Sequence, residues 1–352
     1  MKNSCHNHTS TSTSPTLSIV IPFFNKKILT GKMIDSIIAN KFTSWELLAI
    51  DDGSSQETLE YLKKYEVYDN IQIIHRNIEP KGAQTCRNIG LQKARGEYIV
   101  FFDSDDYITP TCLGTRVSEI TKRPDLDFMV FPSATLVDED FNANAKEFIF
   151  GYKVYKDDIK AFARRELPFI VWSNIYRTAS IRRNSLEWDT NLLSLQDADF
   201  NLRAILAGLK YDYCKTKADY GYRIFYCNDS VSKKICSSDH FNSHIYASEN
   251  FFKYLRLHFG HKYDTAVFQG VLNLYNNIFT DGVDINYAKQ MAECLKKYHK
   301  LYGTLLKIQI AITEVLEHFL PKKRARQIPM VPYLLPFIIR KKMTRKKIKP
   351  IM

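Results

Sequence analysis

The chain has 352 residues, of which 45% are hydrophobic and 25% are charged. This composition is typical of a globular protein and excludes a collagen, a coiled coil and a wholly disordered chain. The length predicts two domains, or one large domain with additions. Residues 321–352 contain eleven Lys and Arg residues and no acid, so about +1 of the net charge of +12 is left for the rest of the chain. The basic character therefore belongs to a C-terminal tail.

The cysteines and the N-terminus indicate the compartment. The seven cysteines are widely spread and form no CxxC pair, so we expect reduced thiols and a cytoplasmic protein. Residues 1–15 are mostly polar and lack an apolar core, which predicts a disordered leader rather than a secretory signal. No uninterrupted apolar stretch reaches about 18 residues, so no ordinary membrane span is expected.

After the leader, short apolar runs alternate with segments of helical spacing. Strands are predicted at residues 17–21, 46–50, 71–74, 98–102 and 127–131, with a further extended piece at 147–154. Helices are predicted at 32–40, 56–65, 82–94 and 195–206, with Gly96 and Gly208 at the ends of the last two, and helices rich in Tyr, Phe and Leu follow residue 240. This alternation predicts an α/β fold, a Rossmann-like and mostly parallel sheet flanked by helices, with a C-terminal helical extension.

Clustered carboxylates follow two of the predicted strands. Asp51 and Asp52 come after one strand, and Asp103, Asp105 and Asp106 come after another. Parallel sheets bind ligands at the carboxyl ends of their strands, and carboxylates are suited to Mg²⁺ or Mn²⁺. Each cluster alone is also compatible with an acidic turn, but the pair favours a functional site.

Asp52 is suited to accept hydrogen bonds from a base or a ribose at such a site. Pro22, Phe23 and Phe24 follow the first strand and would line the same crevice. Simple packing is the favoured interpretation of the two phenylalanines.

Four segments, taken together and in their order along the chain, resemble glycosyltransferase family 2, the inverting GT-A enzymes that use nucleotide-sugars. The segments are residues 18–25, 50–54, 87–90 and 102–106. The resemblance covers about residues 17 to 125. It implies that Asp52 contacts the nucleotide base. It also implies that Asp103, Ser104 and Asp105 form the DxD motif, which holds ribose, diphosphate and a divalent ion, Mn²⁺ or Mg²⁺. Asp105 is the first choice of metal ligand and Asp106 the second.

Arg87 matches the family's Ala-Arg-Asn segment, where the guanidinium contacts the nucleotide-sugar; the alternative is an arginine on a helix surface. The family often has Asn-Gly-Gly before that segment. This chain has residues 77–82 there instead, so no contact residue is transferred to them.

Residues 195–203 resemble the family's Glu-Asp-x-Asp…Arg segment, in which the second position, here Asp197, is the catalytic base. Such a reaction needs a base because an acceptor hydroxyl is a poor nucleophile until a carboxylate takes its proton. The alternative is that Asp197 only complements a helix N-terminus. Gln196 replaces the usual glutamate, which puts any role of that neighbouring carboxylate in question.

Two further matches are looser. Tyr222 and Arg223, with residues 228–232, resemble a family segment near the diphosphate, where Arg223 would clamp phosphate oxygens. A surface ion pair is the alternative for Arg223. Trp172 precedes the acceptor region and would either stack on a sugar or lie in the core, which is commoner.

The tail combines charge with an apolar insert. Basic clusters at 322–326 and 340–347 flank residues 330–339, which are mostly apolar and contain Pro332 and Pro336. The insert is too short to cross a bilayer of about 30 Å. It suits an interfacial segment on an anionic membrane surface. A helix docked on the protein and a nucleic-acid patch are the alternatives; we favour the membrane and expect no nucleic-acid partner.

Together these expectations divide the chain into a leader (1–15), a GT-A domain (16–235), a helical extension (236–320) and a basic tail (321–352). The expected activity is metal-dependent inverting transfer from a nucleotide-sugar, a UDP-sugar, to a hydroxyl of a glycan or lipid-linked glycan. It would serve surface polysaccharide synthesis at the inner face of the cell membrane. The competing functions are a sugar-nucleotide nucleotidyltransferase and a non-catalytic nucleotide-sugar-binding protein with a membrane- or nucleic-acid-binding tail.

Overall fold

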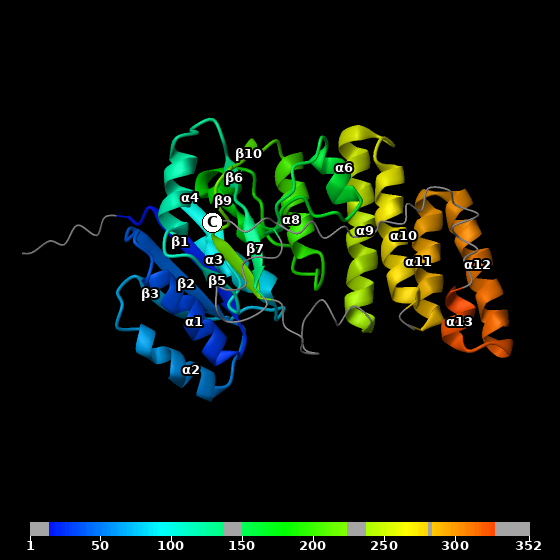
Figure 1. Ribbon diagram of the computed structural model, residues 1–352, viewed down its shortest axis with the longest axis horizontal. Helices are drawn as coiled ribbons and strands as arrows, with labels where there is room; N and C mark the ends of the chain where they lie inside the picture. Colours follow the sequence, from blue (N-terminus) through cyan, green and yellow to red (C-terminus); the bar gives the residue numbers. More distant parts are fainter. Residues whose placement is uncertain (1–13, 137–148, 224–236, 281–283, 328–352) are drawn as a thin grey trace, which may run out of the picture.

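A computed structural model describes residues 14–136, 149–223, 237–280 and 284–327 of the chain. Most of the predicted leader, the predicted boundary at residue 235, residues 228–232 and the tail beyond residue 327 lie outside the described residues. An α/β region at one end is followed by a row of helices at the other (Figure 1).

A seven-stranded sheet forms the centre of the α/β region. Its strands are β1 (Leu17–Phe23), β2 (Trp45–Asp51), β3 (Ile71–His75), β4 (Tyr98–Phe101), β6 (Phe128–Val130), β9 (Asn174–Arg177) and β10 (Tyr211–Tyr213). Their order is β10-β6-β9-β4-β1-β2-β3. Strand β9 is antiparallel to β4 and β6, and the other pairs are parallel. The predicted mostly parallel sheet is confirmed.

Helices cover both faces of this sheet, which explains why its central strands are buried on both sides. They are α1 (Lys27–Ile38), α2 (Gln56–Leu62, continued as a 3₁₀ turn, Lys63–Tyr65), α3 (Ala83–Lys93), α4 (Cys112–Thr121), α6 (Asp158–Ala163), α7 (Thr178–Arg183) and α8 (Gln196–Leu206). Alternate residues of β1 join different cores: Val20 packs in one cluster, and Ile19 and Ile21 in the other. Every residue of β1, β2 and β4 is buried.

Two local predictions were wrong. Helix α1 begins at Lys27, five residues before the predicted start, directly after the left-handed residues Asn25 and Lys26. Gly96 does not cap α3, whose C-cap is Ala94. A Cβ on Gly96 would instead lie 2.5 Å from the backbone nitrogen of Ser18, so glycine is required there by the close approach to β1. Gly208 does have a left-handed φ of 83° after α8, as predicted.

A smaller sheet lies against the large one and consists of β5 (Tyr107–Ile108), β11 (Tyr220–Arg223), β7 (Ser133–Leu136) and β8 (Ile149–Phe150) in that order. A buried ion pair fixes β11. Arg116 of α4 donates two hydrogen bonds of 2.7 Å to Asp219 and one of 2.6 Å to the carbonyl of Trp172 in the 3₁₀ turn Val171–Ser173. Buried charges need such complete pairing. The pair holds the start of β11 next to the segment that follows β4.

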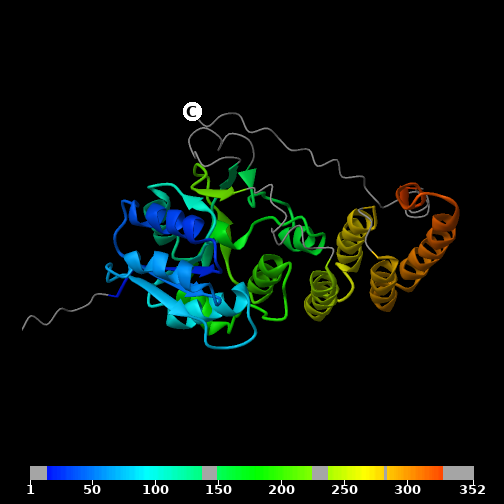
Figure 2. The same ribbon diagram turned by 90° about the horizontal axis from the view of Figure 1, so that it is seen from below.

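The C-terminal region is helical, as predicted. It contains α9 (Ser238–Phe259), α10 (Asp264–Thr280), α11 (Ile285–Tyr298), α12 (Lys300–Phe319) and α13 (Lys322–Gln327), which form a row leading away from the sheet (Figures 1 and 2). Phe251 and Phe252 of α9 belong to the same hydrophobic cluster as Phe200 of α8. The helical row therefore shares a core with the α/β region.

Candidate active site

The carboxyl ends of β1, β2 and β4 frame the candidate site. From β1 the chain proceeds to β2 and β3 on one side, whereas β4 lies on the other side of β1. Such a switch in strand order is where open α/β sheets bind ligands. The loop after β1 is locked to the loop after β2, because Asn25 N–H donates to Ser54 Oγ (2.8 Å) and Ser55 N–H donates to Asn25 Oδ1 (3.0 Å).

Asp52 lies at the end of β2 and is 7% exposed. Its Oδ1 accepts hydrogen bonds from Arg76 Nε (2.7 Å) and from the backbone of Gly82 (3.0 Å). Arg76 follows β3 directly, so it reaches the same sheet edge. Two donors thus fix the orientation of the Asp52 carboxylate.

The acidic segment, residues 103–106, follows β4, and each of its three carboxylates has a different partner. Asp103 Oδ1 accepts from Arg87 Nη2 (2.7 Å), and Asp105 Oδ2 accepts from Lys26 Nζ (2.6 Å). Asp106 is 1% exposed, and it accepts from the Tyr220 hydroxyl (2.6 Å) and the Arg223 backbone (2.9 Å). Asp103 and Asp105 therefore face cations, while Asp106 links the acidic segment to β11.

Burial and mutual repulsion shift the ionisation of this segment. Burial raises the pKa of Asp103, Arg87 opposes this shift and Asp105 adds to it. Burial and the charges of Asp105 and Asp103 raise the pKa of Asp106 well above its usual range. Burial lowers the pKa of Lys26, but the carboxylates, Asp105 first, raise it by more. The segment consequently favours a bound cation.

The donor set fits a divalent ion held together with a diphosphate. Mg²⁺ is usually bound by one or two carboxylates plus phosphate oxygens. The side chains of Asp103 and Asp105 are 28% and 22% exposed, so both can reach a ligand. Both oxygens of Asp106 already accept hydrogen bonds. Within the described residues, no group of three or more His, Cys, Asp or Glu side chains is gathered to hold a metal by itself.

Arg87 lies on α3 and is 5% exposed, so it is not a helix-surface arginine. Its Nη1 donates to Gln196 Oε1 (2.9 Å), and its guanidinium lies over the ring of Trp188, 4.5 Å from the centroid. Asn88 holds Trp188 in place through hydrogen bonds to its backbone N–H and carbonyl. Arg87 therefore joins the acidic segment to the start of α8.

Asp197 is the second residue of α8. Its Oδ1 is buried and has no hydrogen-bond partner. Burial raises the pKa of Asp197 to about 6, Arg87 opposes the rise and Asp103 adds to it. Burial, followed by the charges of Asp106, Asp103, Asp105 and Asp197, raises the pKa of Tyr222 to about 12. Asp103, Asp105, Asp106 and Asp197 thus all lie near enough to one tyrosine for their charges to act on it.

Gln196 occupies the position where the family pattern has a glutamate. Its Oε1 accepts from Arg87, and its Nε2 donates to the carbonyl of Leu193 (3.1 Å). A glutamate could make only the first of these bonds. The amide also adds no further negative charge beside Arg87, Asp103 and Asp197.

The remaining predicted residues are buried around the site. Pro22 lies within β1, Ser104 is 8% exposed and Arg223 is 7% exposed. The Nε of Arg223 is buried and has no hydrogen-bond partner. Trp172 is 5% exposed and stacks on Tyr220 and Tyr222, so it is a core residue. Phe23 is also core, whereas Phe24 is 44% exposed and lies beneath Lys81.

Sequence reasoning missed Lys26, Arg76 and Tyr220. Arg76 has a signal in the sequence, since it follows a predicted strand of the same sheet. Lys26 also follows a strand, but nothing in its neighbourhood distinguishes it from Lys27, which pairs with Glu57 instead. Tyr220 reaches Asp106 only because β11 is placed beside β5, which no local pattern predicts.

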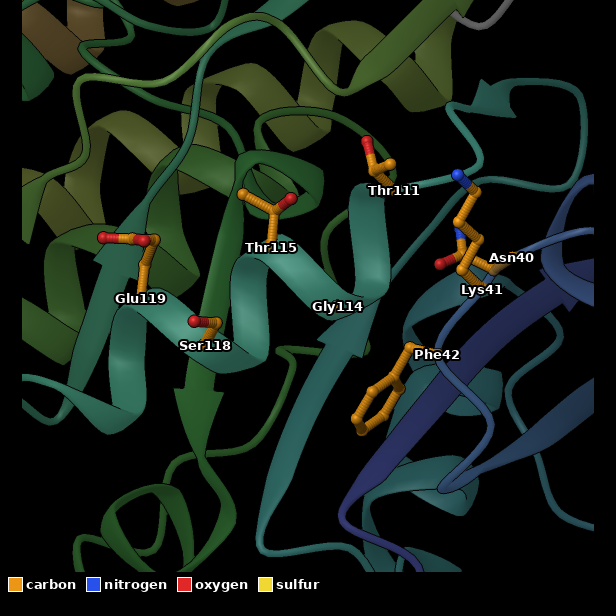
Figure 3. Close-up of a pocket in the computed structure, with 8 residues that line it drawn as sticks. All are labelled: Asn40, Lys41, Phe42, Thr111, Gly114, Thr115, Ser118 and Glu119. Carbon is orange, nitrogen blue, oxygen red and sulfur yellow. The ribbon is translucent and has the colours of Figure 1, made fainter.

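A pocket of about 330 Å³ lies away from these candidate site residues, between the end of α1 and α4 (Figure 3). It is lined by Asn40, Lys41, Phe42, Thr111, Gly114, Thr115, Ser118 and Glu119. None of the predicted site residues lines it.

Comparisons with known proteins agree with this architecture. Residues 18–187 match the family described as Glycosyl transferase family 2. The poly(ribitol-phosphate) beta-N-acetylglucosaminyltransferase TarS of Staphylococcus aureus strain Mu50 is 24% identical over 243 residues, which are 68% of this chain and 39% of TarS. The poly(ribitol-phosphate) beta-glucosyltransferase of Bacillus spizizenii is 26% identical over 209 residues, which are 58% of this chain and 31% of that protein. The chain thus spans about a third to two fifths of the length of these two relatives.

The crystal structure of S. aureus TarS 1-349 in complex with UDP-GlcNAc superposes with a TM-score of 0.63 at 18% identity, covering 85% of this chain and 90% of that one. The same fragment in complex with UDP gives a TM-score of 0.61. These likenesses confirm the predicted fold, including the helical C-terminal region.

Proposed function

Because the chain belongs to glycosyl transferase family 2, we propose that it transfers a sugar, with inversion, from a UDP-sugar to a hydroxyl of a glycan or lipid-linked glycan. Relatives named as poly(ribitol-phosphate) glycosyltransferases support a role in surface polysaccharide synthesis. The observation that carries the proposal is the buried, unpartnered carboxylate oxygen of Asp197 beside Arg87 and the acidic segment.

Asp197 is the proposed base. Its pKa of about 6 leaves it mostly ionised at neutral pH, yet more basic than an ordinary aspartate. Its Oδ1 accepts the proton of the acceptor hydroxyl while that oxygen attacks the anomeric carbon. The bond from this carbon to the diphosphate breaks, and the nucleoside diphosphate leaves with the electron pair.

The diphosphate needs positive charge and donors as it leaves. We assign the divalent ion, Mn²⁺ or Mg²⁺, to Asp105 with Asp103, where it would supply that charge when bound. We assign the ammonium of Lys26, which donates to Asp105, and the side chain of Arg223, whose backbone N–H donates to Asp106 and whose buried Nε has no hydrogen-bond partner, as donors to the diphosphate. Asp106 is the less suitable ligand, because both of its oxygens are used within the protein.

We assign the nucleotide to the edge of the sheet where Asp52, Pro22 and Ser104 lie. The two donors on Asp52 Oδ1 support this role, since a base-reading carboxylate must be held in one orientation. The choice of UDP rests on the TarS fragment, which has been crystallised with UDP-GlcNAc and with UDP.

Replacing Asp197 by Asn should abolish transfer while leaving donor affinity within about threefold, because the amide keeps the shape but cannot take a proton. A panel of nucleotide-sugars is scored for the released nucleotide and for glycoside configuration, with donor affinity measured by calorimetry. Wild-type protein should release UDP and form an inverted glycoside. Release of pyrophosphate would indicate a nucleotidyltransferase, and full turnover by the Asn variant would exclude Asp197 as the base.

The pH dependence tests the electrostatic setting of Asp197. Since the base must be ionised, kcat should rise as pH increases through about 6. Arg87, Asp103, Tyr176 and Tyr222 are the groups that face it. Gln196→Glu adds a negative charge beside Arg87, which should move this rise to higher pH. Gln92→Glu, on the exposed part of α3, is the control, and equal profiles for all three proteins would contradict the assignment.

Lys26 should compete with a divalent ion for Asp105. Lys26→Met removes the competing ammonium, so we expect Mn²⁺ to bind about fivefold more tightly without donor. The free Mn²⁺ signal in electron paramagnetic resonance measures this affinity. Lys27→Met is the matched control because Lys27 pairs with Glu57. Unchanged or weaker Mn²⁺ binding by the Lys26 variant would contradict the metal assignment, as would activity that survives a chelator.

We further propose that the basic tail holds the protein to an anionic membrane surface. Within the described residues, no helix combines the length and apolar character needed to cross a bilayer. The support is compositional: basic residues flank an apolar insert after α13. This attachment would bring a lipid-linked acceptor near the site.

Exchanging Arg340, Lys341, Lys342, Arg345, Lys346 and Lys347 for Gln should remove sedimentation with phosphatidylglycerol vesicles. Each of these residues contributes about 1 kcal/mol near such a surface. Neutral phosphatidylcholine vesicles should bind weakly in either case. The control exchanges Lys63, Lys64 and Lys122, which are exposed elsewhere. Equal sedimentation of the tail variant and the wild type would refute the attachment.

A further inference from the structure

The segment that leads into α8 has an unfavourable backbone conformation. Leu195, the N-cap of α8, adopts φ 62° and ψ 20°, the left-handed region, and its side chain makes no capping hydrogen bond. This conformation is unfavourable for a residue other than glycine, because its Cβ crowds the neighbouring carbonyl oxygen. It persists only where neighbouring contacts hold the segment. Asp197 follows two residues later, so these contacts also set the position of its carboxylate.

The contacts come from the helical extension. Ser243 Oγ of α9 accepts hydrogen bonds from the backbone N–H groups of Leu193 and Ser194, both 3.0 Å long. One turn earlier on the same helix, His240 Nδ1 lies 2.8 Å from Ser194 Oγ. Ser243 is 4% exposed, so water does not readily replace it. Helices α8 and α9 lie side by side (Figure 1).

The same segment is tied to the acidic cluster at its other end. Gln196 Nε2 donates to the carbonyl of Leu193, and Gln196 Oε1 accepts from Arg87. Arg87 in turn donates to Asp103. A continuous series of hydrogen bonds therefore runs from α9, through residues 193–196, to the first carboxylate of the DxD motif.

We infer that Ser243 is a positioning residue for the transfer reaction and that the helical extension thereby holds the proposed base in its working position. The inference rests on the proposed function, because it gives Ser243 a role only through Asp197. One hydroxyl oxygen satisfies two successive backbone donors. Without it, both N–H groups lose an acceptor that is itself buried, and the hydrogen bonds that hold residues 193–194 against α9 are lost. The segment then relaxes from the left-handed turn and shifts Asp197.

Kinetics of Ser243→Ala test this role in the full-length chain. We expect kcat to fall between about 10- and 100-fold, because small displacements of a reacting group have effects of that size. The Kd for the UDP-sugar should stay within about twofold. Ser243→Thr retains the hydroxyl and should restore most of kcat. Ser248→Ala is the matched control: it removes a buried hydroxyl from the same helix, one that binds Arg165 instead of residues 193–194.

Hydrogen exchange gives a second, direct measurement. Amide exchange of a peptide containing Leu193 and Ser194 should accelerate in Ser243→Ala and not in Ser248→Ala. Ser243→Cys, which keeps the volume but weakens the acceptor, provides the same comparison if the alanine variant does not fold.

Three results would overturn the inference: unchanged kcat in Ser243→Ala, an equal fall in Ser248→Ala, or no rescue by Thr. Its failure is distinguishable from failure of the proposed function. Full turnover by Asp197→Asn would show that Asp197 is not the base and would reject the proposed function. An inactive Asp197→Asn variant together with a fully active Ser243→Ala variant would reject only the positioning role of Ser243.

Discussion

Repulsion among carboxylates at one edge of the sheet is the constraint on which the rest of the site depends. Asp103, Asp105 and Asp106 are consecutive or nearly so, and Asp197 joins them from α8. Burial makes their negative charges more costly. The fold compensates with one partner for each member of the segment: Arg87 for Asp103, Lys26 for Asp105 and Tyr220 for Asp106. Asp197 has a buried Oδ1 with no hydrogen-bond partner, and a free carboxylate oxygen is what a base requires.

These partners come from distant parts of the chain, so the packing of the whole α/β region determines the site. Lys26 follows β1, Arg87 lies on α3 and Tyr220 lies on β11. The buried Arg116–Asp219 pair fixes the start of β11 and holds the carbonyl of Trp172. Loss of one member would leave the other as an uncompensated buried charge, which typically costs about 3–5 kcal/mol. Such a change would disturb Tyr220 and, through it, Asp106.

The sequence was sufficient to predict the parts of the site that follow from strand ends and local patterns. Asp52 and Asp103 follow apolar strands, and parallel strands bring their carboxyl ends to one edge. Lys26 was not predictable, because nothing in the sequence distinguishes it from Lys27, yet Lys26 pairs with Asp105 and Lys27 with Glu57. Gly96 was misassigned because a helix end and a close backbone approach both call for glycine. The role of Ser243 depends on packing between α8 and α9, which has no local signature.

The contact between α8 and α9 also changes how the helical extension should be regarded. A change in composition near residue 235 suggests a separate appendage, but the hydrophobic cluster continues from Phe200 into Phe251 and Phe252. The hydrogen bonds from Ser243 lie at the edge of this shared core. Because a packed core transmits small displacements rather than absorbing them, a shift of α9 would move the segment at residues 193–196. Asp197 on α8 and Ser243 on α9 therefore belong to one packed unit, although the sequence places a domain boundary between them at residue 235.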